Sequence, residues 1–427
     1  MSQAMKVLAA TARAATRTLG TCPDAQRAGA LRQAAGALRA GRQAVLEANA
    51  ADCAAAADLP AALLARLHLD AAKVEEMARG LEAVAALPDP LGRVDLRRRL
   101  DEGLELTRIT VPLGVLAVIF ESRPDAAVQI GALAVKSGNA ALLKGGREAA
   151  RTVALLVDLL RGALAAEGLP PGALQRLEDR DEVDALLALH GDVDLVIPRG
   201  SSDLVRAIQA RTRIPVLGHA EGVCHLYLHA AADPAMALDL VRDAKLQYPA
   251  ACNAVETVLV DAAAAPRLVP ALVAALPEVA FRGCPRARAL APMAEAAEAD
   301  WDAEYGAPIL ALRVVDGLDE ALAHIAAHGS GHTEAIVTGD PEAAARFLRE
   351  VDAAGVYHNA STRFADGYRY GFGAEVGIAT GRLHARGPVG LEGLVTVKYL
   401  LQGQGHRVAD YAGPGARPFR HEDLPPA

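Results

Sequence analysis

Short apolar runs alternate with amphipathic stretches through most of the chain, and no other feature of the sequence restricts the fold as strongly. The first series predicts strands at 114–120, 140–144 and 192–197, with helices at 126–136, 147–166 and from residue 202 onward. Strands that are apolar along their whole length and separated by helices are typical of a parallel sheet covered on both faces. The sequence therefore predicts an α/β fold with doubly wound sheets.

A second series of the same kind predicts a second α/β domain. Its strands are expected at 223–228, 256–260, 308–312, 334–338 and 355–357. The expected junction between the two domains lies at residues 218–222. Residues 1–90 are rich in alanine, with larger apolar residues at three- and four-residue spacing and interruptions at Pro23, Pro60 and Pro88, so we expect helices there.

Residues 94–111 predict a β-hairpin. We interpret Asp101, Glu102 and Gly103 as a three-residue turn with the glycine in the left-handed conformation. Three consecutive arginines, Arg97 to Arg99, disfavour a core position, so the hairpin is expected to project as an arm. Residues 403–427 are rich in glycine and proline, and we expect a tail that is ordered at its start and frayed at its end.

The composition argues against several classes of protein. The 427 residues include 44 Lys and Arg against 52 Asp and Glu, and a net charge of −8 favours neither nucleic acid nor an anionic membrane as partner. No apolar run approaches the ~18–20 residues of a transmembrane helix. Five cysteines without a C-x-x-C motif argue against a disulfide framework and a cysteine zinc site. We therefore expect a cytoplasmic protein.

Cys252 is the strongest single candidate for chemistry, since G-x-G-x-x-G, the phosphate-binding loop and G-x-S-x-G are all absent from the sequence. It lies in segment 248–254, which is predicted to connect a helix to strand 256–260. Loops at strand ends are where α/β folds place catalytic groups. From the residues alone, a nucleophile and a small buried thiol both remain open. Cys224 alternates with apolar residues and is predicted to lie in the core.

Two turns after predicted strands can bind an anion. Gly200 and Ser201 open a helix, where free backbone N–H groups and the helix dipole favour negative charge. Lys144 and Arg147 flank a Gly-Gly turn, where a ligand can approach the backbone closely. The alternatives are an ordinary helix cap in the first case and a solvated strand end in the second.

Two further segments concentrate polar residues. His328 and His332 lie among small residues before strand 334–338, but no third zinc ligand is evident and we expect no metal. Residues 357–393 are dense in glycine, histidine and arginine, which favours a substrate-facing loop system over a core segment.

At these residues the chain resembles the γ-glutamyl phosphate reductase (glutamate-5-semialdehyde dehydrogenase) family, within the aldehyde dehydrogenase superfamily. The family pattern V-x5-A-[LIV]-x-H-I-x2-[HY]-[GS]-[ST]-x-H-[ST]-[DE]-x-I is met at every position from Val315 to Ile336. Segments 112–125, 137–148, 214–218, 248–257 and 363–391 are also similar, and the likeness covers residues 5–405. The resemblance implies an aldehyde-dehydrogenase-like fold, with two doubly wound α/β domains and a β-hairpin oligomerisation arm.

The resemblance also implies how the domains are divided. Residues 1–92 and 112–222 would form the NADP-binding domain, residues 223–390 the catalytic domain, and residues 93–111 and 391–410 the arm. Such an arm implies a homodimer or homotetramer. The resemblance leaves open a transient contact with glutamate 5-kinase, which would supply the acyl phosphate.

The activity implied is NADPH-dependent reduction of L-γ-glutamyl 5-phosphate to L-glutamate 5-semialdehyde and phosphate, the second step of proline biosynthesis from glutamate. Cys252 matches the superfamily nucleophile, whose thiolate would displace phosphate to give a thioester. Ser122 stands where the superfamily carries its oxyanion asparagine, and Asn253 is placed with Cys252 in the catalytic group.

The alternative is a hydrolytic or CoA-acylating aldehyde dehydrogenase acting on another small substrate. Val216 stands where hydrolytic members carry a glutamate base, which argues against hydrolysis, and the histidine pattern argues against both activities.

The resemblance assigns further residues to the cofactor and the substrate. Lys144 matches the superfamily lysine near the adenosine ribose, and Arg147 is a candidate for a 2′-phosphate, which favours NADPH over NADH. Gly200 and Ser201 match the pyrophosphate turn, and Glu304 matches the glutamate that holds the nicotinamide ribose. The candidates for the anionic groups of the substrate are Arg123, His219 and Arg386.

Overall fold

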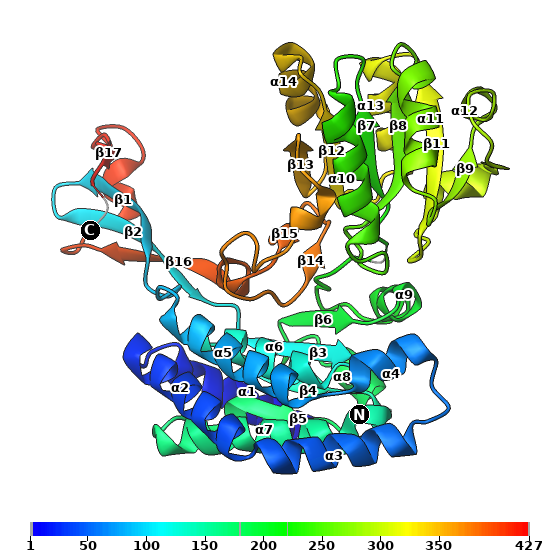
Figure 1. Cartoon of the computed structure of the whole chain (residues 1–427). Helices are drawn as coiled ribbons and strands as arrows, with labels where there is room; N and C mark the ends of the chain where they lie inside the picture. Colours follow the sequence, from blue (N-terminus) through cyan, green and yellow to red (C-terminus); the bar gives the residue numbers. More distant parts are fainter. Residues whose placement is uncertain (1–2, 179–180, 220, 426–427) are drawn as a thin grey trace.

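The computed structural model describes residues 3–178, 181–219 and 221–425 and contains two parallel sheets, one in each of two domains (Figure 1). A four-stranded antiparallel sheet extends to one side as an arm, and a short two-stranded ladder lies between the two domains. The α/β prediction with doubly wound sheets is confirmed.

The amino-terminal region is helical, as its periodicity predicted. The helices are α1 (Gln3–Leu19), α2 (Asp24–Ala40), α3 (Arg42–Ala55), α4 (Ala61–Leu67) and α5 (Ala71–Ala86). Pro23 and Pro60 directly precede α2 and α4, where the missing N–H of proline costs no helical hydrogen bond. Small alanine side chains on α2 and α5 allow these two helices to pack closely against each other.

The first parallel sheet has the strand order β5-β4-β3-β6. Its strands are β3 (Val115–Phe120), β4 (Ala140–Lys144), β5 (Leu174–Arg176) and β6 (Leu195–Arg199). Its α-helices are α6 (Pro124–Lys136), α7 (Ala150–Ala166), α8 (Asp181–Leu187) and α9 (Ser202–Arg211), with the 3₁₀ turns η1 (Arg147–Ala149) and η2 (Pro171–Ala173). Every residue of β3 and β4 is buried, which explains why these strands were visible as continuous apolar runs.

Two features of this sheet differ from the sequence-based prediction. β6 begins at Leu195 rather than at residue 192, because the backbone N–H groups of Asp192 and Val193 close a turn onto Leu189. β5 was not predicted, since a strand of three residues is too short to show a period.

The second parallel sheet has the strand order β10-β9-β11-β8-β7-β12-β13. Its strands are β7 (Cys224–Leu228), β8 (Val255–Asp261), β9 (Ala280–Gly283), β10 (Ala294–Glu295), β11 (Ile309–Val315), β12 (Thr333–Val337) and β13 (Gly355–His358). The helices are α10 (Pro234–Leu246), α11 (Ala265–Ala275), α12 (Pro285–Arg288), α13 (Leu318–His328) and α14 (Pro341–Glu350), with η3 (Glu298–Asp302). All five strands predicted here are present, and the short β9 and β10 were missed. Position 220, inside the predicted junction, lies outside the described residues.

The arm is built on the predicted hairpin. It consists of β1 (Val94–Asp101), β2 (Leu104–Pro112), β16 (Val395–Gln402) and β17 (Glu422–Asp423), in the order β16-β2-β1-β17. The predicted three-residue turn is wrong, because Asp101 pairs with Leu104 and only two residues form the turn. The Asp101 carboxylate accepts the Glu102 N–H over 2.8 Å, which holds it at the end of the strand, and Gly103 has the expected positive φ of 71°.

The carboxyl-terminal tail was predicted to be ordered at its start and frayed at its end. It is ordered further than expected, since its described part returns to the arm, and residues 426–427 lie outside the described residues. After η6 (Val408–Tyr411), β17 pairs with β1. Asp423 forms an ion pair with Arg98 at 2.6 Å, and Glu422 forms one with Arg99 at 2.9 Å. Two of the three consecutive arginines of the hairpin therefore bind the carboxyl-terminal tail.

Residues 361–394 connect the second domain to the arm. They contain η4 (Thr362–Phe364), β14 (Ile378–Ala379), β15 (Gly387–Pro388) and η5 (Leu391–Leu394). The segment is mostly irregular, as expected, but Val376, Val389 and Leu394 are buried in the core of the first domain. The loop system is therefore anchored to the first domain by apolar side chains. Its strands β14 and β15 lie between the two domains (Figure 1).

Candidate active site

Cys252 lies half-buried in the turn that joins α10 to β8, at the place the sequence predicted. The turn is held at its base by a fully buried ion pair of 2.6 Å between Lys245, at the end of α10, and Glu256, at the start of β8. Burial raises the pKa of Glu256 to about 7, and the Lys245 ammonium opposes this shift. A buried pair of this kind fixes the two ends of the turn relative to each other.

The backbone beneath Cys252 is packed closely. A Cβ atom on Gly222 would lie 2.1 Å from the carbonyl oxygen of Cys252, so only glycine fits there. The same oxygen accepts a hydrogen bond from the Cys224 thiol, with an Sγ–O distance of 3.4 Å. Cys224 is fully buried, as predicted for a core residue.

Two histidines lie beside the nucleophile candidate. A ring nitrogen of His219, a ring nitrogen of His332 and the Cys252 sulfur all lie within 4.8 Å of one another. His219 was named as a substrate residue, and it donates from Nδ1 to the carbonyl oxygen of Ile378 over 2.8 Å. Burial lowers the pKa of His219, so its ring is neutral at neutral pH. The approach of His332 to Cys252 was not predicted.

Asn253 ties the nucleophile turn to the loop at η4. Its side-chain amide donates to the carbonyl oxygen of Ala365 over 2.8 Å. The backbone carbonyl of Asn253 accepts a hydrogen bond from the Thr362 hydroxyl over 2.6 Å. Asn253 was placed in the catalytic group, and in the structure its amide N–H serves this link. The side chain is therefore suited to positioning the turn.

Arg363 is a functional candidate that the sequence did not single out. The residue is only 8% exposed, and its Nε–H donates to the Gln247 side chain over 2.9 Å. Burial and the neighbouring Arg369 lower the pKa of Arg363, while Cys252 acts in the opposite direction. Arg363 is thus a buried cation within electrostatic range of the nucleophile. Its place in the Gly-rich stretch 357–393 was the available signal.

Arg123 and Arg199 add two more cations. Burial lowers the pKa of Arg123, and the nearby Arg199 lowers it further. Within the described part of the chain, no hydrogen bond or ion pair engages either guanidinium. Glu375 lies within electrostatic range of Arg199, and Asp125 within range of Arg123, but neither forms an ion pair with them. Two guanidinium groups beside each other favour an anionic ligand. Arg386, the third predicted substrate residue, instead pairs with Asp352 at 2.7 Å.

Ser122 has a positive φ of 46° and is buried. Its backbone N–H and its hydroxyl both donate to the same carboxylate oxygen of Glu148, over 2.7 Å and 2.9 Å. Because the hydroxyl has a single proton, Ser122 can serve as an oxyanion donor only after it leaves Glu148.

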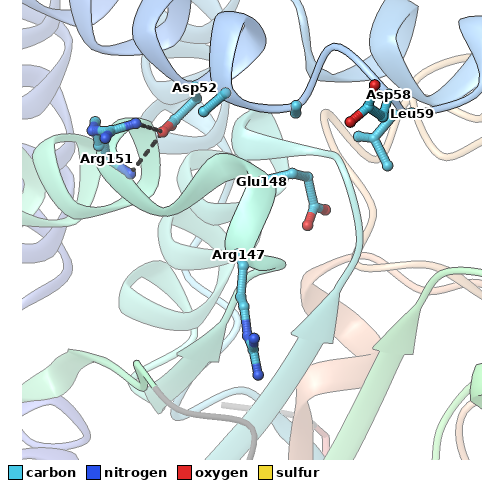
Figure 2. A pocket seen from close by; sticks show the side chains of 8 residues that line it. Asp52, Asp58, Leu59, Arg147, Glu148 and Arg151 are labelled. Carbon is cyan, nitrogen blue, oxygen red and sulfur yellow. Dashed lines mark hydrogen bonds and ion pairs between the residues drawn. The ribbon is translucent and has the colours of Figure 1, made fainter.

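Of the two predicted adenosine-side residues, Arg147 lines a cleft of about 410 Å³ between α3 and the start of α7, whereas Lys144 does not (Figure 2). The residues lining it are Asp52, Ala55, Ala56, Asp58, Leu59, Arg147, Glu148 and Arg151. Arg147 is exposed, whereas Arg151 is held by Asp52, 3.4 Å away. Lys144 is buried at the end of β4, and its ammonium donates to the Gly145 carbonyl over 2.7 Å.

The predicted pyrophosphate turn precedes α9. The Ser201 hydroxyl accepts the N–H of Leu204 over 3.3 Å as the helix N-cap, so the ordinary cap is present. The backbone N–H of Ser201 donates to the Glu121 carboxylate over 3.2 Å. A Cβ atom on Gly200 would lie 2.5 Å from the same carboxylate. An anion therefore already lies at this helix start, supplied by the chain itself.

Glu304 lies on the nucleophile side of the site. Its carboxylate accepts the backbone N–H of Gly222 over 3.0 Å, and Gly222 packs against Cys252. Glu304 and His219 therefore lie around Cys252, whereas Lys144, Arg147, Gly200 and Ser201 lie at the turns after β4 and β6.

Comparison with known proteins gives one consistent family. Residues 2–305 match the model of the aldehyde dehydrogenase family. A γ-glutamyl phosphate reductase of Synechococcus sp. (strain JA-3-3Ab) is 58% identical over 422 residues, covering 96% of this chain and 93% of the relative.

Solved structures agree with this match. A crystal structure of γ-glutamyl phosphate reductase from Thermotoga maritima superposes with a TM-score of 0.92 at 38% identity, covering 94% of this chain and 99% of that one. A glyceraldehyde-3-phosphate dehydrogenase from Methanocaldococcus jannaschii, complexed with NADP, has a TM-score of 0.66 at 16% identity and covers 94% of each chain. The second likeness concerns the fold alone. Among the described helices, none combines the length and the hydrophobicity needed to cross a membrane.

Proposed function

Since the chain belongs to the aldehyde dehydrogenase family, and within it to the γ-glutamyl phosphate reductases of the second step of proline biosynthesis, we propose that Cys252 carries the reaction as a thioester. The observation that carries this proposal is the surroundings of Cys252. It is half-buried, held in a fixed turn, and lies within electrostatic range of the buried cation Arg363.

The chemistry proposed begins with the thiolate. The Cys252 sulfur attacks the acyl carbon of γ-glutamyl phosphate, a C–S bond forms, and the bond to the phosphate oxygen breaks with release of inorganic phosphate. Arg363, Arg123 and Arg199 are proposed to bind the phosphate and carboxylate groups, because burial lowers the pKa of Arg363 and of Arg123, and none of the three forms an ion pair within the described residues.

Hydrolysis of the thioester needs a base that activates water. At the position of the family base this chain has Val216, which lies beside β6 and carries no titratable group. Its apolar side chain favours survival of the thioester until reduction.

The oxyanion of the thiohemiacetal needs hydrogen-bond donors. Among the hydrogen bonds of residues 3–178, 181–219 and 221–425, none engages the backbone N–H of Cys252, so this group is free to donate. Ser122 remains the proposed second donor, provided that its hydroxyl leaves Glu148.

A nicotinamide cofactor is general in this family. The residues after β4 and β6 fit such a group, because Gly200 has no Cβ and the Ser201 N–H lies at a helix start, where the cofactor would take the place of the Glu121 carboxylate that now accepts this N–H. When bound, the nicotinamide supplies the hydride that reduces the thioester. Lys144 and Glu304 are proposed to hold its two riboses, at the end of β4 and beside Cys252 respectively.

NADPH is the form that we propose. Arg147 lies exposed at the cleft in Figure 2 without an acidic partner among the described residues, and a guanidinium there is suited to a 2′-phosphate. The second arginine of the cleft, Arg151, is tied to Asp52.

Members of this family are typically oligomeric, and we propose that the arm forms the contact in a homodimer or homotetramer. β16 is an edge strand of the arm sheet, and Val397, Tyr399 and Leu401 on it are exposed. Exposed apolar residues on an edge strand favour pairing with another chain. A contact with glutamate 5-kinase remains a prediction from the resemblance.

The test is phosphate dependence in the oxidative direction. NADP⁺ reduction by glutamate 5-semialdehyde is followed with phosphate, without phosphate, and with CoA in its place. We expect turnover only with phosphate and none in Cys252→Ser, while the matched control Cys284→Ser stays active. Turnover without phosphate would establish a hydrolytic enzyme, and turnover with CoA a CoA-acylating one.

A further inference from the structure

Three metal-ligating atoms converge at the nucleophile. The Cys252 sulfur and one ring nitrogen each from His219 and His332 lie within 4.8 Å of one another, and the two rings meet edge to face with centroids 4.8 Å apart. His219 comes from the connection between the domains and His332 from the start of β12. The fold brings the three donors together from separate segments, and no carboxylate is among them.

The bonding of His219 leaves one nitrogen available. Its Nδ1 lies 2.8 Å from a backbone carbonyl oxygen, which can only accept, so Nδ1 carries the proton. In the neutral ring, the lone pair is therefore on the second nitrogen, Nε2. A histidine that binds a metal through one ring nitrogen usually donates the N–H of its other ring nitrogen to a carbonyl, a carboxylate or water.

His332 offers a second donor. The ring is fully buried, and its Nε2 has no hydrogen-bond partner in the described structure. Its Nδ1 lies 2.9 Å from the Thr333 hydroxyl and 3.8 Å from the Cys224 sulfur. A buried polar atom left without a partner is unfavourable, and a ligand that engages it removes this penalty.

We infer that Cys252, His219 and His332 form an open three-donor site for a thiophilic divalent cation, with Zn²⁺ and Cd²⁺ as the matching ions. Two imidazoles and a thiolate are donors that zinc prefers, whereas Mg²⁺ and Ca²⁺ require oxygen ligands. Binding forms a sulfur–metal bond and releases the thiol proton to solvent, while both histidines bind as neutral rings. The fourth position is left for water.

The geometry requires only a small adjustment. Bonds of about 2.0 Å to nitrogen and 2.3 Å to sulfur place tetrahedral donors about 3.3–3.5 Å apart, so the atoms must close by up to about 1.5 Å. Cys252 lies in a turn outside any helix or strand and is half-buried, so rotation of its side chain can bring the sulfur toward the two nitrogens.

The consequence for the enzyme is inhibition. A sulfur bound to the cation cannot attack the acyl phosphate, so the site is open to a cation only when substrate is absent. This consequence rests on the proposed role of Cys252, whereas the binding itself does not. The cation is therefore an inhibitor. This inference departs from the sequence-based expectation of no metal at His332, because the missing ligands are His219 and Cys252, which are distant in the chain.

The test uses Cd²⁺ alone on the metal-free full-length protein. Binding is followed by the ultraviolet charge-transfer absorption of the cadmium–thiolate bond, and the metal content by elemental analysis. We expect one Cd²⁺ per chain and loss of the absorption in Cys252→Ser. His332→Ala should weaken binding by more than about tenfold, since loss of even an outer partner of a ligand costs 10–100-fold. The matched control is His328→Ala, four residues earlier and bonded to Asp302, which should bind as the wild type does.

Three results would overturn the inference: no Cd²⁺ binding by the wild type, an undiminished absorption in Cys252→Ser, or equal affinity in His332→Ala and wild type. His332→Gln, checked with the other variants by circular dichroism, guards against a folding defect in the alanine variant. Turnover is measured separately. Wild type that binds Cd²⁺ without phosphate-dependent activity contradicts the proposed function alone, and active wild type that binds no Cd²⁺ contradicts this inference alone.

Discussion

The hydroxyl of Thr362 donates a hydrogen bond of 2.6 Å to the backbone carbonyl of Asn253, the residue directly after the proposed nucleophile. Together with the bond from the Asn253 amide to Ala365, it joins the Cys252 turn to the loop that carries Arg363. The nucleophile and the nearest buried cation are therefore held as one unit, although they come from segments more than a hundred residues apart.

Thr362→Val should lower kcat, because removal of the hydroxyl leaves the Asn253 carbonyl without its donor, a loss of about 1–3 kcal/mol. Thr362→Ser keeps the hydroxyl and should restore most of the activity. Steady-state kinetics with NADP⁺, glutamate 5-semialdehyde and phosphate give the comparison. Equal activity of the valine and serine variants would show that the hydrogen bond has no role.

Arg363→Gln should raise the KM for phosphate in the oxidative direction. A charge-assisted hydrogen bond to phosphate contributes about 1.5–3 kcal/mol, which corresponds to roughly ten- to hundredfold. The matched control is Arg349→Gln, because Arg349 is exposed and already paired with Glu350. An unchanged KM for phosphate in Arg363→Gln would remove this residue from substrate binding.

Arg147→Ala should weaken NADPH binding by about 1.5–3 kcal/mol and leave NADH binding unchanged, because only NADPH carries the 2′-phosphate. Arg151→Ala is the control from the same cleft, since Asp52 already holds that side chain. Isothermal titration with both cofactors measures the two affinities. Equal losses for NADPH and NADH would contradict the role in the 2′-phosphate site.

Glu121→Gln should strengthen NADPH binding. The Glu121 carboxylate accepts the Ser201 N–H at the start of α9, where we place the cofactor pyrophosphate, so the two anions compete. Removing the charge should lower the dissociation constant by a factor of about 2–5, from the ~0.3–1 kcal/mol of a charge at an exposed helix terminus. Weaker binding in Glu121→Gln would indicate that this carboxylate supports the site.

The stability of the fold should fall in acid because of His324. Burial, assisted by His225 and His328, lowers the pKa of His324 from 6.5 to about 2. The unfolded chain therefore binds a proton that the folded chain does not between these two values. The stabilisation is fully present above pH 6.5 and is lost as the pH falls, by up to about 1.4 kcal/mol per pH unit.

Urea unfolding at a series of pH values from 7.5 to 4.5 measures this effect. His324→Gln does not titrate, so its unfolding midpoint should change less with pH than that of the wild type. His190→Gln alters an exposed histidine and should follow the wild type. If the unfolding midpoint changes with pH equally in His324→Gln and in the wild type, the loss of stability in acid does not come from His324.

The local pattern of apolar and polar residues determined most of the secondary structure of this protein. The fully buried strands β3, β4, β7 and β8 were visible as apolar runs, because a strand covered on both faces leaves a signal in consecutive residues. The position of Cys252 between a helix and a strand followed from the same signal.

Only the tertiary structure decided which groups meet. The approach of His332 to Cys252, the buried guanidinium of Arg363, the contact of Ser122 with Glu148 and the return of the tail to Arg98 join segments that are distant in the chain. Such contacts depend on the packing and register of whole elements, and residue order carries no local trace of them. The sequence by itself thus determined most helices and strands and the turn that carries the proposed nucleophile. Tertiary packing decided which charged groups and hydrogen-bond donors lie around the Cys252 sulfur.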